Sequence, residues 1–305
     1  MNIEVNECRK IYSQNPATKE MEFIGVAYPT KEKKELTPRQ KKLLKYKSDL
    51  SKYTESLGGY IHMSYVKDTL LFNELNIDRA NITRLIYLST FIDYNSSQEN
   101  LLVKHGKDYK KEAMTRADIK KLLKLSDRAF ISFFNEMKIN NLLFEVNGKF
   151  YVSNNYFSKG NCNFNTKEYT RIFINTTRAL YENSTTRQHK QLSYIYQLVP
   201  YMNYELNILC SNPKETDFYK LEKLSLLNIC ELLNVSTESR SMRKLRDELL
   251  KFNVTVDGKK YNFLSYARVG VGHNLKDYFI INPSVVWCGR DTNRVKETLQ
   301  VCFFN

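Results

Sequence analysis

The sequence predicts a mainly helical α+β fold: two tandem winged helix-turn-helix domains related by internal duplication, preceded by a basic N-terminal extension. Three observations predict it. One order of segments recurs after about 110 residues. Each copy contains two short amphipathic helices separated by a three-residue turn, and a hairpin pattern follows each helix pair. We expect the extension at 1–58, the first domain at 59–165, and the second, with an enlarged wing, at 166–305.

The extension is rich in cations and contains one expected helix. Thr37-Pro38 is typical of an N-cap followed by proline at the first helical position. Leu43, Leu44, Tyr46 and Leu50 give this helix only a narrow apolar stripe. A merely solvated face explains the pattern as well as a binding surface does. The basic residues are Lys31, Lys33, Lys34, Arg39, Lys41, Lys42, Lys45, Lys47 and Lys52.

The recurrence is carried by aliphatic and aromatic positions in three pairs of segments. The pairs are Tyr60–Phe72 with Tyr169–Tyr181, Leu85–Tyr94 with Ile195–Tyr204, and Thr115–Ser126 with Ser225–Ser236. The closing segments, Phe150–Asn154 and Tyr278–Asn282, are further apart, which places an insertion of about 18 residues in the second copy. The alternative is a coincidence between two ordinary sets of amphipathic helices.

The first copy is expected to contain a helix-turn-helix with a wing. Thr115 is a good N-cap, and Ile119, Leu122 and Leu123 share one helix face. Lys124–Ser126 is expected to be the turn, and a second helix to run from Ser126 to about Asn140. Asn147-Gly148, between two alternating runs, is a strong signal for a β-hairpin.

The second copy follows the same plan. Ser225 is expected to start its first helix, Asn234–Ser236 to form the turn, and Thr237–Lys251 to form the second helix. The wing is expected to begin at Val254 and to contain the insertion.

A winged helix buries one face of its second helix and offers the other to the major groove of DNA. The basic and polar residues expected on the outward faces point to phosphate and base contacts. In the second copy they are Ser239, Arg240, Arg243, Lys244 and Arg246; in the first, Arg128, Ser132, Asn135 and Lys138; and in the wings, Lys149, Lys259, Lys260, Arg268 and Lys276. We expect the second copy to supply most of the affinity, because its helix is the more basic.

The composition supports a polyanionic partner. Lys and Arg total 47 against 33 Asp and Glu, a formal net charge of +14. No apolar run is long enough to span a membrane, and the first ten residues lack the apolar segment of a secretory signal, so we expect a cytoplasmic protein. The six cysteines form no C-x-x-C pair and are expected to be free thiols.

We expect neither enzymatic activity nor a cofactor or metal. No phosphate-binding G-x-x-x-x-G-K-[ST] motif occurs, which argues against an ATPase or helicase. The four histidines form no H-x-H or H-E-x-x-H pattern, which argues against a metal nuclease, a relaxase or a zinc protease.

Several segments together resemble plasmid replication proteins of the RepL type and related phage proteins. They are Tyr60–Tyr65, Leu85–Asn95, Met114–Ile119 and a closing strand that runs into Asn282-Pro283 and Gly289. The first copy departs from this ending, with Asn155 where proline is expected and one fewer residue before Gly160. The presence of two copies is similar instead to the paired winged-helix domains of iteron-binding plasmid initiators. The resemblance implies a mobile-element protein that binds an origin or an operator.

The leading hypothesis is therefore sequence-specific binding of double-stranded DNA in phage or plasmid replication initiation. A second copy of the chain, in a homodimer, and host replication or transcription proteins are the further partners considered. A transcriptional repressor or activator that uses the same contacts is the alternative. The third hypothesis is a winged-helix adaptor that binds a host protein instead of DNA.

Overall fold

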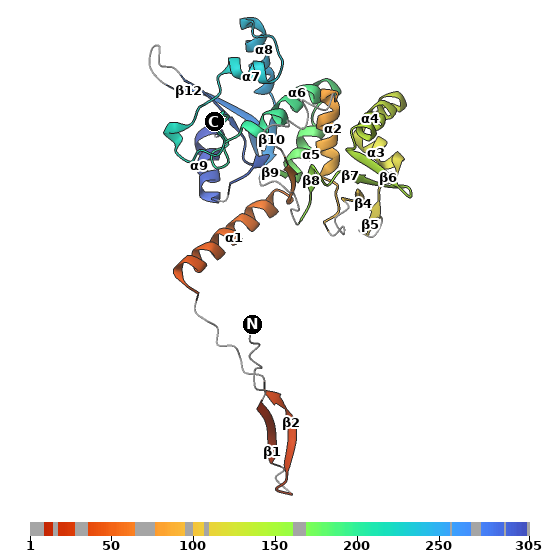
Figure 1. Ribbon diagram of the computed structural model, residues 1–305, viewed down its shortest axis with the longest axis vertical. Helices are drawn as coiled ribbons and strands as arrows, with labels where there is room; N and C mark the ends of the chain where they lie inside the picture. The colour runs from red at the N-terminus through yellow and green to blue at the C-terminus, as the bar shows by residue number, and fades with distance from the viewer. Residues whose placement is uncertain are drawn as a thin grey trace. The chain divides into compact units, whose positions relative to one another are not determined.

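The computed structural model describes residues 9–14, 18–27, 36–64, 77–94, 100–106, 110–160, 169–256, 258–269, 276–289 and 291–303. It has a mixed α+β fold with small antiparallel sheets (Figure 1). The contacts between residues divide the chain into two units, Met1–Lys45 and Tyr46–Asn305. Lys31, Lys33 and Lys34 of the expected basic extension lie outside the described residues.

The first unit contains an antiparallel hairpin that the sequence pattern does not predict, formed by β1 (Arg9–Gln14) and β2 (Met21–Ala27). Helix α1 (Pro38–Ser56) starts where Thr37-Pro38 predicts. The Thr37 hydroxyl accepts a hydrogen bond from the Gln40 amide, and the Gln40 side chain accepts one from the Thr37 amide. These two bonds satisfy backbone donors that have no partner within the helix.

The second unit is organised around a four-stranded antiparallel sheet of order β14-β9-β3-β8. The strands are β3 (Tyr60–Ser64), β8 (Phe157–Ser158), β9 (Tyr169–Phe173) and β14 (Val286–Trp287). The two central strands, β3 and β9, pair so that His62 lies opposite Arg171. Each of them also pairs with one short outer strand, β8 beside β3 and β14 beside β9.

Three helices pack together next to this sheet (Figure 1). They are α2 (Arg79–Ser89), α5 (Ile174–Glu182) and α6 (Thr186–Leu198). Helix α2 is buried from Ala80 to Ser89 and packs chiefly on α6. Tyr181 stacks between Tyr87 and His189, with ring centroids 3.9 Å and 4.1 Å away. One apolar core cluster therefore continues across the boundary expected near residue 165.

The remaining elements form two similar series. The first contains β4 (Val103–His105), β5 (Lys111–Ala113), α3 (Arg116–Leu123), α4 (Asp127–Ile139), β6 (Leu143–Val146) and β7 (Lys149–Val152). The second contains η2 (Val199–Tyr201), η3 (Phe218–Lys220), α7 (Leu226–Leu232), α8 (Ser239–Leu249), β10 (Asn253–Val256), β11 (Lys259–Asn262), β12 (Leu264–Val269) and β13 (Lys276–Ile281). Helix α9 (Thr292–Phe303), which the sequence pattern does not predict, follows β14.

The same long-range hydrogen bonds recur in the two series. Asn100 donates from its side chain to the Phe157 carbonyl, and Asn207 donates to the Val286 carbonyl. Both asparagines are buried, and both have positive φ, 49° and 57°. Backbone bonds recur in the same way, for example Val152 to Asn100 and Ile281 to Asn207.

These bonds correct the alignment of the closing segments. The Ser153 amide donates to the Leu142 carbonyl, and the Asn282 amide donates to the Phe263 carbonyl. Asn282 therefore corresponds to Ser153, not to Asn154 as the sequence comparison assumes. With this shift, the stretches from Ser153 to Gly160 and from Asn282 to Gly289 are equally long. The first copy therefore does not lack a residue before Gly160, as the sequence comparison had suggested.

The segment that is expected to form the enlarged wing contains two hairpins, β10–β11 and β12–β13. β12 and β13 form the hairpin that corresponds to β6 and β7, since Leu264 pairs with Ile281 as Leu143 pairs with Val152. The separate hairpin of β10 and β11 is inserted between α8 and β12. Residues 65–76 lie outside the described residues, so the expected match of that stretch to α5 stays a prediction.

The buried His62 imidazole predicts a pH-dependent stability. Burial and, to a smaller extent, the nearby Arg171 guanidinium together lower its pKa from 6.5 to about 4. Between these two pKa values the unfolded chain binds more protons than the folded chain. The free energy of unfolding should therefore fall as the pH falls through this interval, by about 3 kcal/mol for complete protonation.

The test is urea unfolding at several pH values for the native chain and for His62→Gln. We expect the variant to lose most of the dependence in this interval and to retain a smaller part from His189, whose pKa burial also lowers. An unchanged pH profile in His62→Gln would contradict the assignment.

Candidate nucleic-acid interface

The first helix pair, α3 and α4, is positioned by local signals that are visible in the sequence. Thr115 caps α3, and its hydroxyl and the Asp118 carboxylate form a reciprocal capping box. Lys124 ends the helix with a left-handed backbone, φ 53°. Ser126 then caps α4 by accepting from the Ala129 amide. The turn and both helix starts thus occur where the sequence analysis places them.

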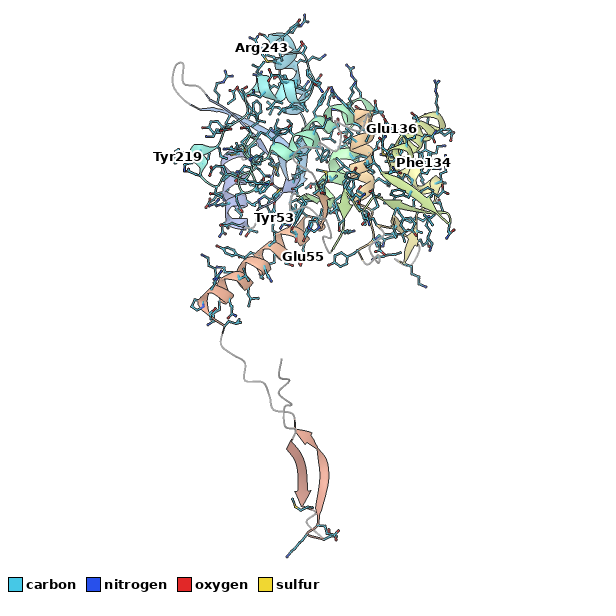
Figure 2. The ribbon with its side chains drawn as sticks, viewed as in Figure 1. Tyr53, Glu55, Phe134, Glu136, Tyr219 and Arg243 are labelled. Carbon is cyan, nitrogen blue, oxygen red and sulfur yellow. The ribbon has the colours of Figure 1, made fainter. Side chains whose placement is uncertain are left out.

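Helix α4 buries one face and exposes the other. Its buried residues are Phe130, Phe133, Phe134 and Met137. Arg128, Ser132, Asn135 and Lys138 are all exposed. Glu136 faces a neighbouring helix, because its carboxylate accepts from the Asp78 amide at the start of α2 (Figure 2). The four predicted contact residues of this helix are therefore free to meet an external partner.

The exposed face of α4 is only weakly cationic. It contains Asp127, which forms an ion pair with Lys120, as well as Arg128 and Lys138. Ile131 and Ile139 are also exposed, with 49% and 79% of their surface accessible. A mixed surface of this kind suits a protein contact as well as a DNA contact.

The second helix pair, α7 and α8, repeats the arrangement with one difference. Ser225 caps α7 in a capping box with Asn228, and Asn234 adopts a left-handed backbone, φ 50°, as Lys124 does. Helix α8 begins at Ser239 rather than at Thr237, and it ends at Leu249 rather than at Lys251. The Ser236 hydroxyl accepts from the Glu238 amide, so Thr237 and Glu238 remain outside the helix.

Helix α8 presents a cationic outward face. Leu245 and Leu249 are buried, while Ser239, Arg240, Arg243 and Lys244 are exposed. Figure 2 shows Arg243 at the periphery of the unit Tyr46–Asn305. No ion pair joins Arg240, Arg243 or Lys244 to another residue of the described ranges. These three cations are available to an anionic partner.

Arg246 differs from the expectation of a free cation. Its guanidinium donates to the adjacent Asp247 carboxylate at 2.9 Å and lies over the Tyr266 ring, 5.7 Å from the centroid. The side chain is half-buried. This ion pair offsets part of its charge, so Arg246 is better suited to linking α8 to β12 than to neutralising a phosphate.

The wing residues fall on three hairpins. Lys149 begins β7 and is exposed. Lys259 and Lys260 lie on β11, with Lys260 exposed, and Lys276 begins β13. Arg268 on β12 pairs with Asp277 at 2.8 Å, which reduces its expected role as a free cation.

Sequence reasoning missed Tyr266, which joins these elements. Its ring lies within reach of the guanidinium groups of both Arg246 and Arg268, and its hydroxyl donates to Asp277. The alternation of residues along β12 does not indicate this role, because the partner arginine on α8 is distant in sequence.

Over the described ranges, no three His, Cys, Asp or Glu side chains gather in a way that could hold a metal ion. Within the same part of the chain, no helix is long and apolar enough to cross a bilayer. Cys210, Cys230 and Cys302 are free thiols.

Comparisons with known protein families, with curated proteins and with solved structures found no match to this chain.

Proposed function

We propose that the protein binds double-stranded DNA through two winged-helix modules that arose by duplication, and that α8 supplies most of the affinity. The observation that carries the proposal is the exposed face of α8, where Arg240, Arg243 and Lys244 have no acidic partner among the described residues. An α-helix fits the major groove, and arginine can bind guanine through two hydrogen bonds. The formal net charge of +14 favours the same kind of partner.

The duplication is supported by the recurring backbone geometry. The capping boxes at Thr115 and Ser225 and the left-handed residues Lys124 and Asn234 occur at matching positions. The buried asparagine bonds of Asn100 and Asn207 are a further shared feature, and they favour duplication over a chance resemblance between two helix pairs.

The pairing of the central strands relates β3 and β9 by a local two-fold axis, and we infer that the two modules follow the same axis. Because β3 and β9 are antiparallel and correspond to each other in the repeat, the equivalent residues His62 and Arg171 lie opposite each other. Two DNA-binding helices that are related by a two-fold axis bind two half-sites that are inverted repeats of each other. The outward residues of α4 and α8 differ, so the proposed target is an imperfect inverted repeat with one half-site bound more tightly.

Within this function we favour origin binding in replication initiation of a phage or plasmid, on the strength of the sequence resemblance. Transcriptional regulation uses the same contacts and is the second candidate. The mixed face of α4, with exposed Ile131 and Ile139, favours a protein contact by the first module in either role. A winged-helix adaptor without DNA affinity is the third candidate, and the salt dependence of DNA binding distinguishes it from the other two.

The test begins with footprinting of the tagged protein across the genome of its host, followed by fluorescence anisotropy on the recovered duplex. For about four neutralised phosphates, the affinity should fall on the order of 100-fold between about 50 and 200 mM salt. Sites clustered in a replication origin would favour the initiator, and promoter sites the regulator. Absence of salt-dependent binding to any recovered duplex would refute the proposal in favour of the adaptor.

A further inference from the structure

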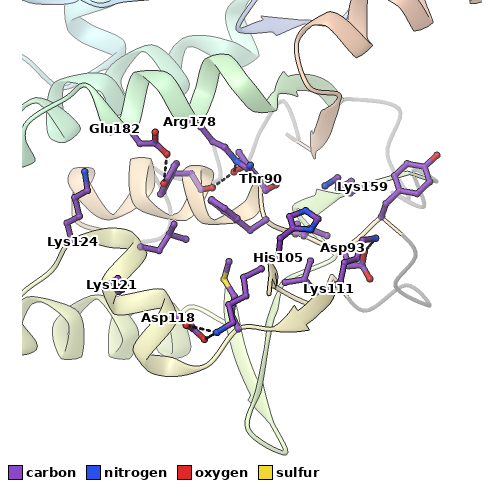
Figure 3. A pocket seen from close by; sticks show the side chains of 18 residues that line it. Thr90, Asp93, His105, Lys111, Asp118, Lys121, Lys124, Lys159, Arg178 and Glu182 are labelled. Atoms are coloured by element: carbon purple, nitrogen blue, oxygen red, sulfur yellow. Dashed lines mark hydrogen bonds and ion pairs between the residues drawn. The ribbon is translucent and has the colours of Figure 1, made fainter. Parts of the chain in front are cut away.

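A pocket of about 480 Å³ lies on the first module, against helix α5 (Figure 3). Its walls come from the end of α2, the β4–β5 hairpin, α3, the segment after β8, and α5. The volume lies in the range of small-molecule sites. Part of the wall is apolar and includes Phe91, Val103, Met114 and Leu122.

The carboxylates of this pocket already have partners. Asp93 binds Lys111 at 2.6 Å, and Asp118 binds Lys104 at 2.8 Å. Glu182 accepts a hydrogen bond from the Tyr87 hydroxyl at 2.9 Å. Glu182 keeps its charge, which attracts Arg178. The lining still has six basic side chains of lysine and arginine against three carboxylates, so the pocket carries an excess of positive charge.

The cations of the pocket outside these two ion pairs are Arg178, Lys159, Lys121 and Lys124. Arg178 is held in place by donating to the hydroxyl and the carbonyl of Thr90, and it lies 3.8 Å from the centroid of Phe91. Lys159 is half-buried beside Arg178 and Lys111. Burial lowers the pKa of Lys159, and the two neighbouring cations lower it further, against the weaker attraction of Asp93.

Lys159 forms no ion pair with another residue of the described ranges. A half-buried ammonium group next to two further cations is costly unless an anion accompanies it. The fixed Arg178 guanidinium provides directional donors at the same place. An apolar wall next to an excess of cations is typical of a site that binds an organic anion.

We propose that this pocket binds a nucleoside phosphate, with its phosphate on Lys159 and Arg178 and its nucleoside against the apolar wall. A phosphate carries a charge of about −1.5 to −2 at neutral pH, which suits several converging cations better than a single carboxylate does. The ligand would touch α2 and α3, which follow β3, and also α5, which follows β9. It would thus link the two modules and offset the repulsion between their cations.

The test is isothermal titration of the full chain with AMP, with adenosine and with inorganic phosphate. We expect AMP to bind more tightly than either of the other two, because only AMP provides both the charge and the apolar body. Lys159→Met should weaken AMP binding about tenfold or more through loss of a charge-assisted hydrogen bond. Lys159→Arg should retain most of the affinity, and Lys190→Met, on the exposed face of α6, should match the native chain.

Thermal unfolding without ligand separates binding from folding. Lys159→Met should be at least as stable as the native chain, because it removes a half-buried charge. Undetectable AMP binding, AMP binding that is unaffected by Lys159→Met, or inorganic phosphate binding as tightly as AMP would overturn the proposal. So would a loss of DNA affinity in Lys159→Met without any AMP binding, since the pocket would then belong to a DNA interface. The titration contains no DNA, so its failure leaves the proposed DNA binding untouched.

Discussion

Replacing Arg240 and Arg243 together with alanine is expected to weaken binding to the recovered duplex by about 100-fold. Each side chain is exposed on α8 and has no acidic partner among the described residues. Loss of one arginine contact to a base or phosphate costs about 1–3 kcal/mol. The combined loss is measured by fluorescence anisotropy at one fixed salt concentration, because the affinity itself depends on salt.

The matched control is Arg128→Ala combined with Lys138→Ala on α4. These residues are exposed on the corresponding helix of the first module, and the substitutions remove the same formal charge. We expect a loss of about tenfold or less, because this face carries fewer cations. Equal losses in the two double variants would contradict the ranking of the modules. Unchanged unfolding temperatures would show that both variants remain folded.

Arg246 provides a second control within α8 itself. Because it already binds Asp247 and contacts the Tyr266 ring, its removal should affect stability more than DNA affinity. The structure thus changes the choice of variant, since the sequence alone treats Arg243 and Arg246 as equivalent outward cations.

Elements with strong local signals were predictable from the sequence. The capping residues Thr115, Ser126 and Ser225 and the Asn147-Gly148 turn fix their helices and hairpin through short-range bonds. Where the local sequence signal was ambiguous, the helix boundary in the structure differs from the predicted one. Ser236 resembles Ser126 but bonds to Glu238 outside the helix, so α8 starts later than expected.

Features made by distant segments could not be predicted in this way. The pairing of β3 with β9 depends on which of several short strands meet, which no local pattern specifies. The ion pairs of Arg246 and Arg268 depend on χ angles and on neighbouring strands. The pocket around Lys159 and Arg178 is formed by five separate segments, and neither residue stands out in the sequence.

The recurring asparagines give the second large expected effect. Asn207 is buried, its backbone is left-handed at φ 57°, and its side-chain amide donates to the carbonyls of Ile281 at 3.0 Å and Val286 at 2.7 Å. Asn207→Ala leaves two buried carbonyls without this donor and places alanine in a conformation that it disfavours. We expect a loss of about 3–5 kcal/mol in the free energy of unfolding, measured by urea denaturation.

Asn207→Gly separates the two causes, because glycine adopts positive φ without strain while also losing the side-chain bonds. Its loss should be about 1 kcal/mol smaller than that of Asn207→Ala. If the modules arose by duplication, Asn100→Ala should show the same behaviour on a smaller scale, since within the described residues Asn100 makes one such bond, to Phe157. Its φ of 49° predicts the same advantage of glycine over alanine. Alanine and glycine variants of equal stability at both positions would mean that the left-handed backbone is not what selects asparagine there.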